Sequence, residues 1–377
     1  MAVVGAGVFG AWAAWHLRRA ERSVVLVDKY APASTRASSG GETRVIRMAY
    51  GPDEIYTRMS RRSLGLWKSF LARVSRPELF RETGVLWMAP AEDERATSAL
   101  GILRSVGIRH ERLTSADLAR RFPQILVPPG GWAIFEPESG ALLARRAAHA
   151  VVEDAVRSGV DLRQDAILPP TGSGHLAEVR TASGDSVRAG AFVFACGPWL
   201  GKVLPDVLGG RIFPTRQEVY YFGVPEGDRR FAPPAMPTWL DFESDYYGLP
   251  DLESRGFKVA CDRHGDPIDP DTAERTPSAF DLARAREFLA HRFPALARAP
   301  LVGAEVCQYE NTSNGDFVID RHPAFDNVWI AGGGSGHGFK NGPAVGELVA
   351  ERVLSGGTAD PRFSLAAKRT EKRREVH

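Results

Sequence analysis

The sequence predicts a mixed α/β protein in which a parallel, Rossmann-like sheet is interleaved with a second, α+β domain built on an antiparallel sheet. The first observation is a glycine-rich turn near each end of the chain, each placed between an apolar strand and a helix. The second is a fully apolar strand in the middle of the chain, which is typical of a sheet covered on both faces. The third is a set of segments that alternate polar and apolar residues, as antiparallel strands do.

The N-terminal segment reads AVVGAGVFGAWAAWHLRRAERSVVLVDK. A short strand leads into three glycines, a helix follows, and a second strand ends at Asp28. Gly5 allows the tight turn, Gly7 lets a pyrophosphate approach the backbone, and Gly10 lets the helix pack on the strand. Asp28 follows at the distance where a carboxylate accepts hydrogen bonds from ribose hydroxyls. The segment therefore predicts a bound dinucleotide.

The segment from Ala304 to Glu347 has similar features near the other end of the chain. It contains Cys307, an apolar strand over residues 328–331, a glycine-rich turn and Lys340, and we expect the next helix to open at Pro343. Glycines let the backbone approach a ligand, and the free N–H groups at a helix start favour an anion. Two such segments predict one large cofactor held from both sides.

The middle of the chain supplies further elements of both sheets. Residues 57–74 have helical periodicity, and we expect Leu64, Trp67 and Leu71 to lie in a core. A second helix within residues 141–162 and an apolar strand over residues 191–200, broken at Gly197-Pro198, belong to the parallel sheet. The alternating segments are residues 80–90, 130–138 and 215–225.

These elements predict a discontinuous division of the chain. The cofactor domain is expected to contain residues 1–78, 138–210 and 313–377, and the substrate domain residues 79–137 and 211–312.

The composition excludes several classes of protein. The 377 residues are 44% hydrophobic and 25% charged with a net charge of +2, so no nucleic-acid partner is expected, and the basic tail 368–377 is interpreted as a solvated end. Three scattered cysteines, Cys196, Cys261 and Cys307, predict neither a disulfide framework nor a metal site. The first strand begins almost at Met1 and no apolar run could span a bilayer. We expect a cytoplasmic monomer without a signal peptide.

At this point the residues resemble a known family. The chain is similar to the amine-oxidising flavoenzymes of the monomeric sarcosine oxidase, N-methyltryptophan oxidase and pipecolate oxidase group, within the D-amino-acid oxidase superfamily of FAD-dependent oxidoreductases. The blocks that show the resemblance are GAGVFG, SSGGETRVIRMAYG, YYGLP, GFKVA, CQY and GSGHGFK, beginning at residues 5, 38, 246, 256, 307 and 334. Three departures are visible: Asp28 stands where the family more often has Glu, Ser38-Ser39-Gly40-Gly41 stands where sarcosine oxidases have a His-His pair, and the segment after CQY lacks a Thr-Pro.

The resemblance implies an FAD-dependent oxidase of a secondary amino acid, N-methyl or cyclic. Hydride equivalents pass to flavin N5, the imine hydrolyses in water, and oxygen is reduced to hydrogen peroxide. The helix after the second glycine-rich turn would point its positive end at the flavin. Among the residues named from the motifs and the resemblance, those expected to contact the cofactor are Gly5, Gly7, Val8, Phe9, Gly10, Asp28, Ser39, Thr43, Arg44, Cys196, Gly197, Cys307, Gly334, Gly336, His337, Gly338 and Lys340.

Two arginines three residues apart, Arg44 and Arg47, could form a solvated basic turn or bind an anion. By resemblance, Arg44 lies near the flavin ring in a catalytic role, while Arg47 and Lys340 bind the substrate carboxylate. Tyr246 and Tyr309 match tyrosines that line the substrate cavity, although either could be ordinary aromatic core.

Cys307 has three interpretations: a small buried hydrophobe, a catalytic thiol, or, by resemblance, the residue that forms a thioether with the flavin 8α-methyl. Lys258 could be an edge-strand lysine, or, by resemblance, the cation beside flavin N5 that promotes the reaction with oxygen. His337 lies in the glycine-rich loop and is taken as a third catalytic candidate.

Two rival functions remain at this stage. One is a dehydrogenase on the same fold that uses an acceptor other than oxygen. The other is a flavoprotein that acts as a tailoring or binding module in a biosynthetic pathway.

Overall fold

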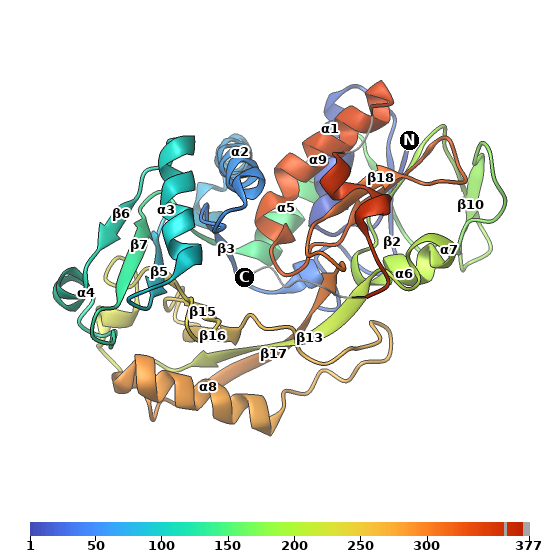
Figure 1. Ribbon diagram of the computed structural model, residues 1–377. Helices are drawn as coiled ribbons and strands as arrows, with labels where there is room; N and C mark the ends of the chain where they lie inside the picture. Colours follow the sequence, from blue (N-terminus) through green and yellow to red (C-terminus); the bar gives the residue numbers. More distant parts are fainter. Residues whose placement is uncertain (358–359, 372–377) are drawn as a thin grey trace.

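The computed structural model of the protein describes residues 1–357 and 360–371 and contains two large sheets formed by one chain (Figure 1). The six-stranded sheet has the order β18-β19-β12-β1-β2-β9. Its strands are β1 (Ala2–Val4), β2 (Val25–Asp28), β9 (Asp161–Gln164), β12 (Phe192–Phe194), β18 (Val318–Arg321) and β19 (Val328–Gly332). All neighbouring pairs are parallel except β18 with β19. The predicted parallel sheet is confirmed.

Strand β1 lies at the point where the chain changes direction across this sheet. Strand β2 pairs with one side of β1 and β12 with the other. In open α/β sheets, ligands bind at the carboxyl ends of the strands at such a switch point. The apolar strand expected over residues 191–200 is shorter than that, because a 3₁₀ turn over Gly197–Trp199 follows β12.

Helices α1 (Val8–Arg19) and α9 (Gly338–Ser355) pack on this sheet and on each other, α5 (Ala144–Arg157) packs on α1, and α2 (Glu54–Arg73) packs on α9. Trp12 of α1 contacts Trp67 and Phe70 of α2 edge-to-face, with ring centroids 5.0 Å apart in both pairs. Leu64 and Leu71 are buried with Trp67, as expected for the core face of α2.

Helix α9 does not open at Pro343, so that expectation is wrong. It begins at Gly338, and Pro343 lies inside it. Proline lacks an N–H and disturbs the helix around it. Helix α2 compensates, because Trp67 Nε1 donates to the Lys340 carbonyl at 3.1 Å and the Ala344 N–H donates to Ser63 Oγ at 3.4 Å.

The eight-stranded sheet has the order β17-β13-β16-β15-β14-β5-β7-β6. Its strands are β5 (Val85–Ala89), β6 (Glu111–Leu113), β7 (Trp132–Glu136), β13 (Phe213–Phe222), β14 (Thr238–Asp241), β15 (Tyr246–Leu249), β16 (Phe257–Cys261) and β17 (Leu301–Asn311). Every pair is antiparallel except β14 with β5. The three alternating segments overlap β5, β7 and β13, which confirms the predicted second sheet.

The long strands β13 and β17 pair along their length and extend from the eight-stranded sheet toward the six-stranded one (Figure 1). Helix α8 (Ala279–Arg292) packs on the eight-stranded sheet, where Trp239 stacks on Phe288 with centroids 5.5 Å apart. The remaining elements are α3 (Glu94–Val106), α4 (Ser115–Arg121), α6 (Leu200–Val203), α7 (Pro205–Leu208), the small sheet β3 (Arg44–Ile46), β8 (Gly140–Leu142) and β4 (Phe80–Arg81), and the hairpin β10 (Glu178–Arg180) with β11 (Ser186–Arg188).

The strands of the six-stranded sheet all come from the segments assigned to the cofactor domain, and those of the eight-stranded sheet from the segments assigned to the substrate domain. The domain boundaries themselves stay a prediction. Within the described part of the chain, no helix is long and apolar enough to cross a membrane.

The expectation of a solvated C-terminal tail fails at its first residue. Lys368 is buried and its Nζ donates to Asn314 Oδ1 at 3.1 Å and to the Arg362 carbonyl at 3.0 Å. Residues 372–377 of the tail lie outside the described residues.

Candidate active site

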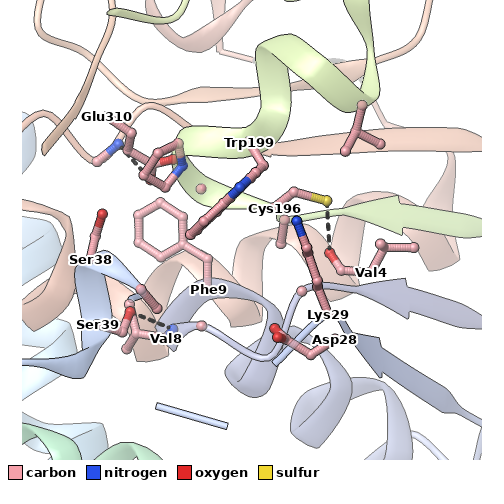
Figure 2. Close-up of a pocket in the computed structure, with 18 of the residues that line it drawn as sticks. Val4, Val8, Phe9, Asp28, Lys29, Ser38, Ser39, Cys196, Trp199 and Glu310 are labelled. Atoms are coloured by element: carbon pink, nitrogen blue, oxygen red, sulfur yellow. Dashed lines mark hydrogen bonds between the residues drawn. The ribbon is translucent and has the colours of Figure 1, made fainter. Parts of the chain in front are cut away.

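A cavity of about 280 Å³ opens at the carboxyl ends of β1, β12 and β19 (Figure 2). Its walls come from segments far apart in the sequence: the turn after β1, the end of β2, the loop before β3, the end of β12, strand β17 and the loop before α9. Of the expected cofactor residues, it is lined by Gly5, Gly7, Val8, Phe9, Asp28, Ser39, Arg44, Cys196, Gly197, Gly334, Gly336 and Gly338. The two glycine-rich segments therefore face one cavity.

The turn after β1 leaves backbone donors free at the start of α1. Gly5 has φ +104°, which favours glycine, and a Cβ there would lie 2.3 Å from the Ala195 carbonyl oxygen. Helix α1 has no side-chain cap and no acidic residue in its first turn. The Val8 N–H donates to Ser39 Oγ at 3.0 Å, and that hydroxyl can itself donate onward into the cavity. This arrangement suits a pyrophosphate.

Asp28 lies at the end of β2, where it lines the same cavity. Its Oδ2 accepts from the Ala6 N–H at 2.5 Å and its Oδ1 from the Tyr30 N–H at 2.8 Å. Burial raises the pKa of Asp28, and these two N–H groups oppose the rise. The carboxylate is thus fixed in orientation, and its remaining lone pairs can accept hydrogen bonds from ribose hydroxyls.

The loop before α9 presents its backbone to the cavity, while the His337 side chain points away. His337 Nδ1 lies 3.2 Å from the Tyr50 hydroxyl and Nε2 lies 3.1 Å from the Gly315 carbonyl oxygen. The imidazole also stacks on Phe317 with centroids 4.7 Å apart. Both ring nitrogens are therefore engaged in this buried cluster, and the catalytic role expected for His337 stays a prediction.

Arg44 lines the cavity, and its guanidinium contacts Cys307. The Arg44 guanidinium donates to the Ser38 carbonyl at 2.8 Å, to the Thr43 carbonyl at 2.9 Å and to Cys307 Sγ at 3.3 Å. A Cβ on Gly41 would lie 2.2 Å from this guanidinium, so only glycine leaves room for it. The sulfur atom of Cys307 is thus held next to a residue that lines the cavity.

Lys258 is buried in an interior strand, so its interpretation as an edge-strand lysine is wrong. Strand β16 pairs with β13 on one side and β15 on the other. Lys258 Nζ donates to the Thr43 carbonyl at 3.0 Å and to Thr43 Oγ1 at 3.2 Å. Burial, and then the positive charge of Arg44, lower the pKa of Lys258 to about 7.

Arg47 and Lys340 flank the same aromatic ring. Arg47 Cζ lies 4.3 Å from the centroid of Tyr50 and 4.6 Å from that of Trp87, and Lys340 Nζ lies 4.9 Å from Tyr50 (centroid distances). Both side chains are buried, with exposed fractions of 4% and 5%, so the interpretation of Arg47 as part of a solvated turn is wrong. Neither forms an ion pair with a carboxylate within residues 1–357 and 360–371.

Glu136 holds the backbone behind this pair in place. Its carboxylate accepts from the Met48 N–H at 2.8 Å, the Ala49 N–H at 2.9 Å and Trp87 Nε1 at 3.0 Å. Burial, and then the charge of Arg47, lower the pKa of Lys340 well below its ordinary value. Two buried cations without a carboxylate partner are costly, and an anionic ligand between them would offset that cost.

Strand β15 places Tyr246 and Tyr247 on opposite faces, and Tyr247 is the one that interacts with Tyr309. The Tyr246 ring stacks on Phe288 with centroids 4.4 Å apart in the core of the second sheet. Tyr247 follows on the opposite face of the strand and interacts with the Tyr309 hydroxyl, which donates to Asp262 Oδ1 at 2.8 Å. The register of β15 was not specified by the sequence pattern, so the two tyrosines could not be told apart.

Three lining residues that sequence reasoning missed are Ser38, Gln308 and Glu310. Within the described residues, Ser38 Oγ, Gln308 Oε1 and Glu310 Oε2 are buried and have no hydrogen-bond partner. The only signal in the sequence was their position beside Ser39 and within CQYE. Free backbone donors at α1, a fixed carboxylate on β2 and unpartnered oxygens along the wall fit a ligand such as FAD, which has phosphates at one point and hydroxyls on both sides.

Comparison with known proteins agrees with this geometry. A family model described as FAD dependent oxidoreductase matches residues 1–352. A monomeric sarcosine oxidase from Bacillus sp. (strain NS-129) is 33% identical over 362 residues, which are 94% of this chain and 93% of that protein. An N-methyl-L-tryptophan oxidase from Escherichia coli is 30% identical over 359 residues, 93% of each chain.

Solved structures show the same fold. The L-proline dehydrogenase from P. horikoshii superposes with a TM-score of 0.81 over 97% of this chain and 96% of that one, at 23% identity. The similarity extends over both sheets.

Proposed function

Because the chain belongs to the FAD-dependent oxidoreductase family and is an amine oxidoreductase with FAD as its cofactor, we propose that it is an oxidase of a secondary amino acid, N-methyl or cyclic. The observation that supports this most directly is the pair of buried cations, Arg47 and Lys340, beside Tyr50. An α-amino acid supplies the carboxylate that the pair lacks. The relatives named as oxidases of sarcosine and N-methyl-L-tryptophan support an N-alkylated amine.

The proposed role of Arg47 and Lys340 is to fix the substrate by its carboxylate. Two charge-assisted contacts to one small acid leave little freedom to the neighbouring α-carbon. Trp87 and Tyr50 sandwich the Arg47 guanidinium, which keeps it in place before substrate arrives. Bound FAD supplies the two-electron acceptor, so no side chain needs to be a strong base.

The remaining wall is proposed to orient the amine. Burial and the Asp262 carboxylate raise the pKa of Tyr309 well above its ordinary value, so its hydroxyl stays protonated. Tyr247 and Tyr309 thus offer polar groups next to Asp262. The amine loses a proton and hydride equivalents to become an imine, water hydrolyses the imine, and oxygen takes up two electrons and two protons as hydrogen peroxide.

Lys258 is proposed to act on oxygen. Its Nζ is held by Thr43, the residue before Arg44, so a positive charge is fixed at that edge of the cavity. A fixed cation stabilises negative charge that develops on oxygen during its reduction. Cys307, beside Arg44, is proposed to form the thioether to the cofactor.

The described cysteines are all free, which supports a reducing compartment such as the cytoplasm. The oligomeric state that we propose is a monomer.

The experiment that tests the proposed function is anaerobic mixing of the purified protein with candidate substrates, followed by the visible absorbance of the flavin. The panel contains sarcosine, larger N-methyl amino acids, L-proline, L-pipecolate and primary D- and L-amino acids. We expect bleaching by N-methyl or cyclic members, and one hydrogen peroxide per substrate once air is admitted. Bleaching by primary amino acids alone would contradict the proposal, and bleaching without peroxide under air would favour a dehydrogenase.

A further inference from the structure

Glu310 lies in β17, in the wall of the cofactor cavity, and its carboxyl group is surrounded by glycine residues. Its Oε1 accepts from the Gly334 N–H at 3.1 Å. A Cβ on Gly334 would lie 3.1 Å from Oε1, and Cβ atoms on Gly197 and Gly332 would lie 3.4 Å and 3.6 Å from Oε2. Gly334 therefore leaves room for this carboxyl group after the end of β19, while Cβ atoms on Gly197 and Gly332 would lie at ordinary contact distances from it.

The second oxygen of this carboxyl group has no partner. Glu310 is 8% exposed, and Oε2 is buried without a hydrogen bond to any of the described residues. Burial raises the pKa of Glu310 to about 7, although the N–H groups of Gly334 and Gly333 oppose the rise. An unpartnered oxygen at this depth is costly, and it indicates a ligand that supplies the missing donor.

The position of Glu310 selects which part of the cofactor supplies that donor. Figure 2 shows Glu310 and Asp28 at opposite sides of the cavity with Phe9 between them. The Asp28 side suits the adenosine ribose, and the N–H groups at the start of α1 suit the phosphates. A phosphate beside Glu310 would bring two anions together and would offer no proton. The flavin N3–H lies at the ring edge opposite the 8α-methyl group that Cys307 is proposed to bind, so the donors of FAD nearer to Cys307 and Arg44 are the hydroxyl groups of the ribityl chain.

We propose that Glu310 Oε2 accepts a hydrogen bond from a hydroxyl group of the ribityl chain of FAD, with Oε1 anchored on the Gly334 N–H. The glycine-rich loop and the cofactor are thereby joined through one side chain. This inference rests on FAD as the cofactor and adds a residue to its binding site. Ser38 Oγ and Gln308 Oε1, which are also unpartnered, line the same cavity.

The test compares FAD with FAD analogues that lack one ribityl hydroxyl. Binding to the apoprotein is measured by flavin fluorescence in chains with Cys307→Ala, so that no covalent bond interferes. In the chain that keeps Glu310, we expect one deoxy analogue to bind roughly tenfold to hundredfold more weakly than FAD. In Glu310→Gln, FAD should bind more weakly by a similar factor, and the discrimination against that analogue should disappear.

The matched control is Glu218→Gln. Glu218 is also 8% exposed and lies on the neighbouring strand β13, but its oxygens accept from Tyr220, Arg216 and the Ser278 N–H. This variant should keep the full discrimination between FAD and the analogue. If Glu310→Gln does not fold, the inference is still tested by the affinities of the chain that keeps Glu310 for FAD and for the deoxy analogues.

Equal affinity of that chain for FAD and every ribityl-deoxy analogue overturns the inference, as does unchanged discrimination in Glu310→Gln. A chain that binds no FAD at all would instead overturn the cofactor assignment.

Discussion

At the scale of single residues, the site is defined by buried cations that form no ion pair with a carboxylate of the described residues. Arg47, Lys340 and Lys258 are 4%, 5% and 2% exposed, and each is held by backbone carbonyls, a hydroxyl group or aromatic rings. Such groups reduce stability unless they serve a ligand. Arg47 and Lys340 flank Tyr50, while Lys258 lies beside Thr43. The first two are therefore proposed to bind the substrate carboxylate and Lys258 to act on oxygen.

The carboxylate pair is tested with Arg47→Met and Lys340→Met, which keep much of the apolar side chain. Losing one charge-assisted contact should cost about 1.5–3 kcal/mol, roughly a ten- to hundredfold loss in kcat/KM for the best amino-acid substrate. The surface variant Lys68→Met is the control, since the Lys68 side chain is 41% exposed and forms an ion pair with Glu82. Unchanged kcat/KM in both buried variants would show that the substrate carboxylate binds elsewhere.

Lys258→Met separates the two half-reactions. Anaerobic flavin bleaching by substrate should change little, while reoxidation by oxygen should slow roughly a hundred- to a thousandfold, because a lost preorganised charge costs about 2.7–4 kcal/mol in comparable sites.

The pKa of Lys258 is lowered to about 7, so the ammonium is present below that pH and lost above it. Reoxidation of the unmodified protein should therefore slow as pH rises through about 7, and the variant should show no such dependence. Stopped-flow absorbance measures both, and a collapse of bleaching with normal reoxidation would move Lys258 into the substrate site.

Cys307→Ala tests covalent attachment. The Arg44 guanidinium donates to Cys307 Sγ at 3.3 Å, and Arg44 lines the cavity, so the sulfur atom lies next to the proposed cofactor site. After acid precipitation we expect the yellow colour in the pellet for the unmodified chain and in the supernatant for the variant. Colour in the supernatant from the unmodified chain would leave Cys307 as a small buried side chain.

At the scale of elements, the close contact between α1 and α9 positions both glycine-rich turns. A Cβ on Gly346 of α9 would lie 2.5 Å from Trp12 Cβ and 2.6 Å from the Trp12 backbone carbon. The two helices begin at the two turns, so a shift of one relative to the other would widen the cavity between them. Gly65 of α2 is also helical, but it is exposed, and a Cβ added there would have no atom within 4 Å.

Gly346→Ala and Gly65→Ala form a matched pair at this scale. We expect Gly346→Ala to destabilise the protein by about 1–3 kcal/mol, because backbone atoms of α1 must move. Gly65→Ala should stabilise it by about 0.5–1 kcal/mol, because alanine favours the helix. Thermal unfolding midpoints of the two variants should move in opposite directions, and a fall of equal size in both would contradict the packing described for α1 and α9.

At the scale of the whole molecule, the interleaved sheets and the first glycine-rich turn could be predicted from the sequence, because strand and helix periods and glycine spacing are local. Side-chain direction was harder. Tyr246 and Tyr247 lie on opposite faces of β15, and a shift of one residue exchanges their roles. His337 lies in the correct loop, but its ring turns into a cluster with Tyr50 and Phe317 that only the tertiary structure brings together.

The surroundings of Glu310 also could not be predicted from the sequence. Its neighbours Gly197, Gly332 and Gly334 come from the ends of two other strands, so nothing near it in the sequence indicated a buried carboxyl group. Proline is common at the start of a helix, so the sequence predicts that the last long helix begins at Pro343. Contacts from α2 instead allow Pro343 to lie inside α9.

The central claim is that one FAD per chain oxidises an amine that the protein holds by its carboxylate. The most direct measurement is the rate of anaerobic flavin bleaching with matched pairs of amines: sarcosine with dimethylamine, L-proline with pyrrolidine, and L-pipecolate with piperidine. We expect the amino acid of the best pair to bleach the flavin at least roughly a hundredfold more efficiently than its partner without the carboxylate, since two charge-assisted contacts are lost. Equal bleaching by both members of every pair, or a protein that binds no flavin, would contradict the account.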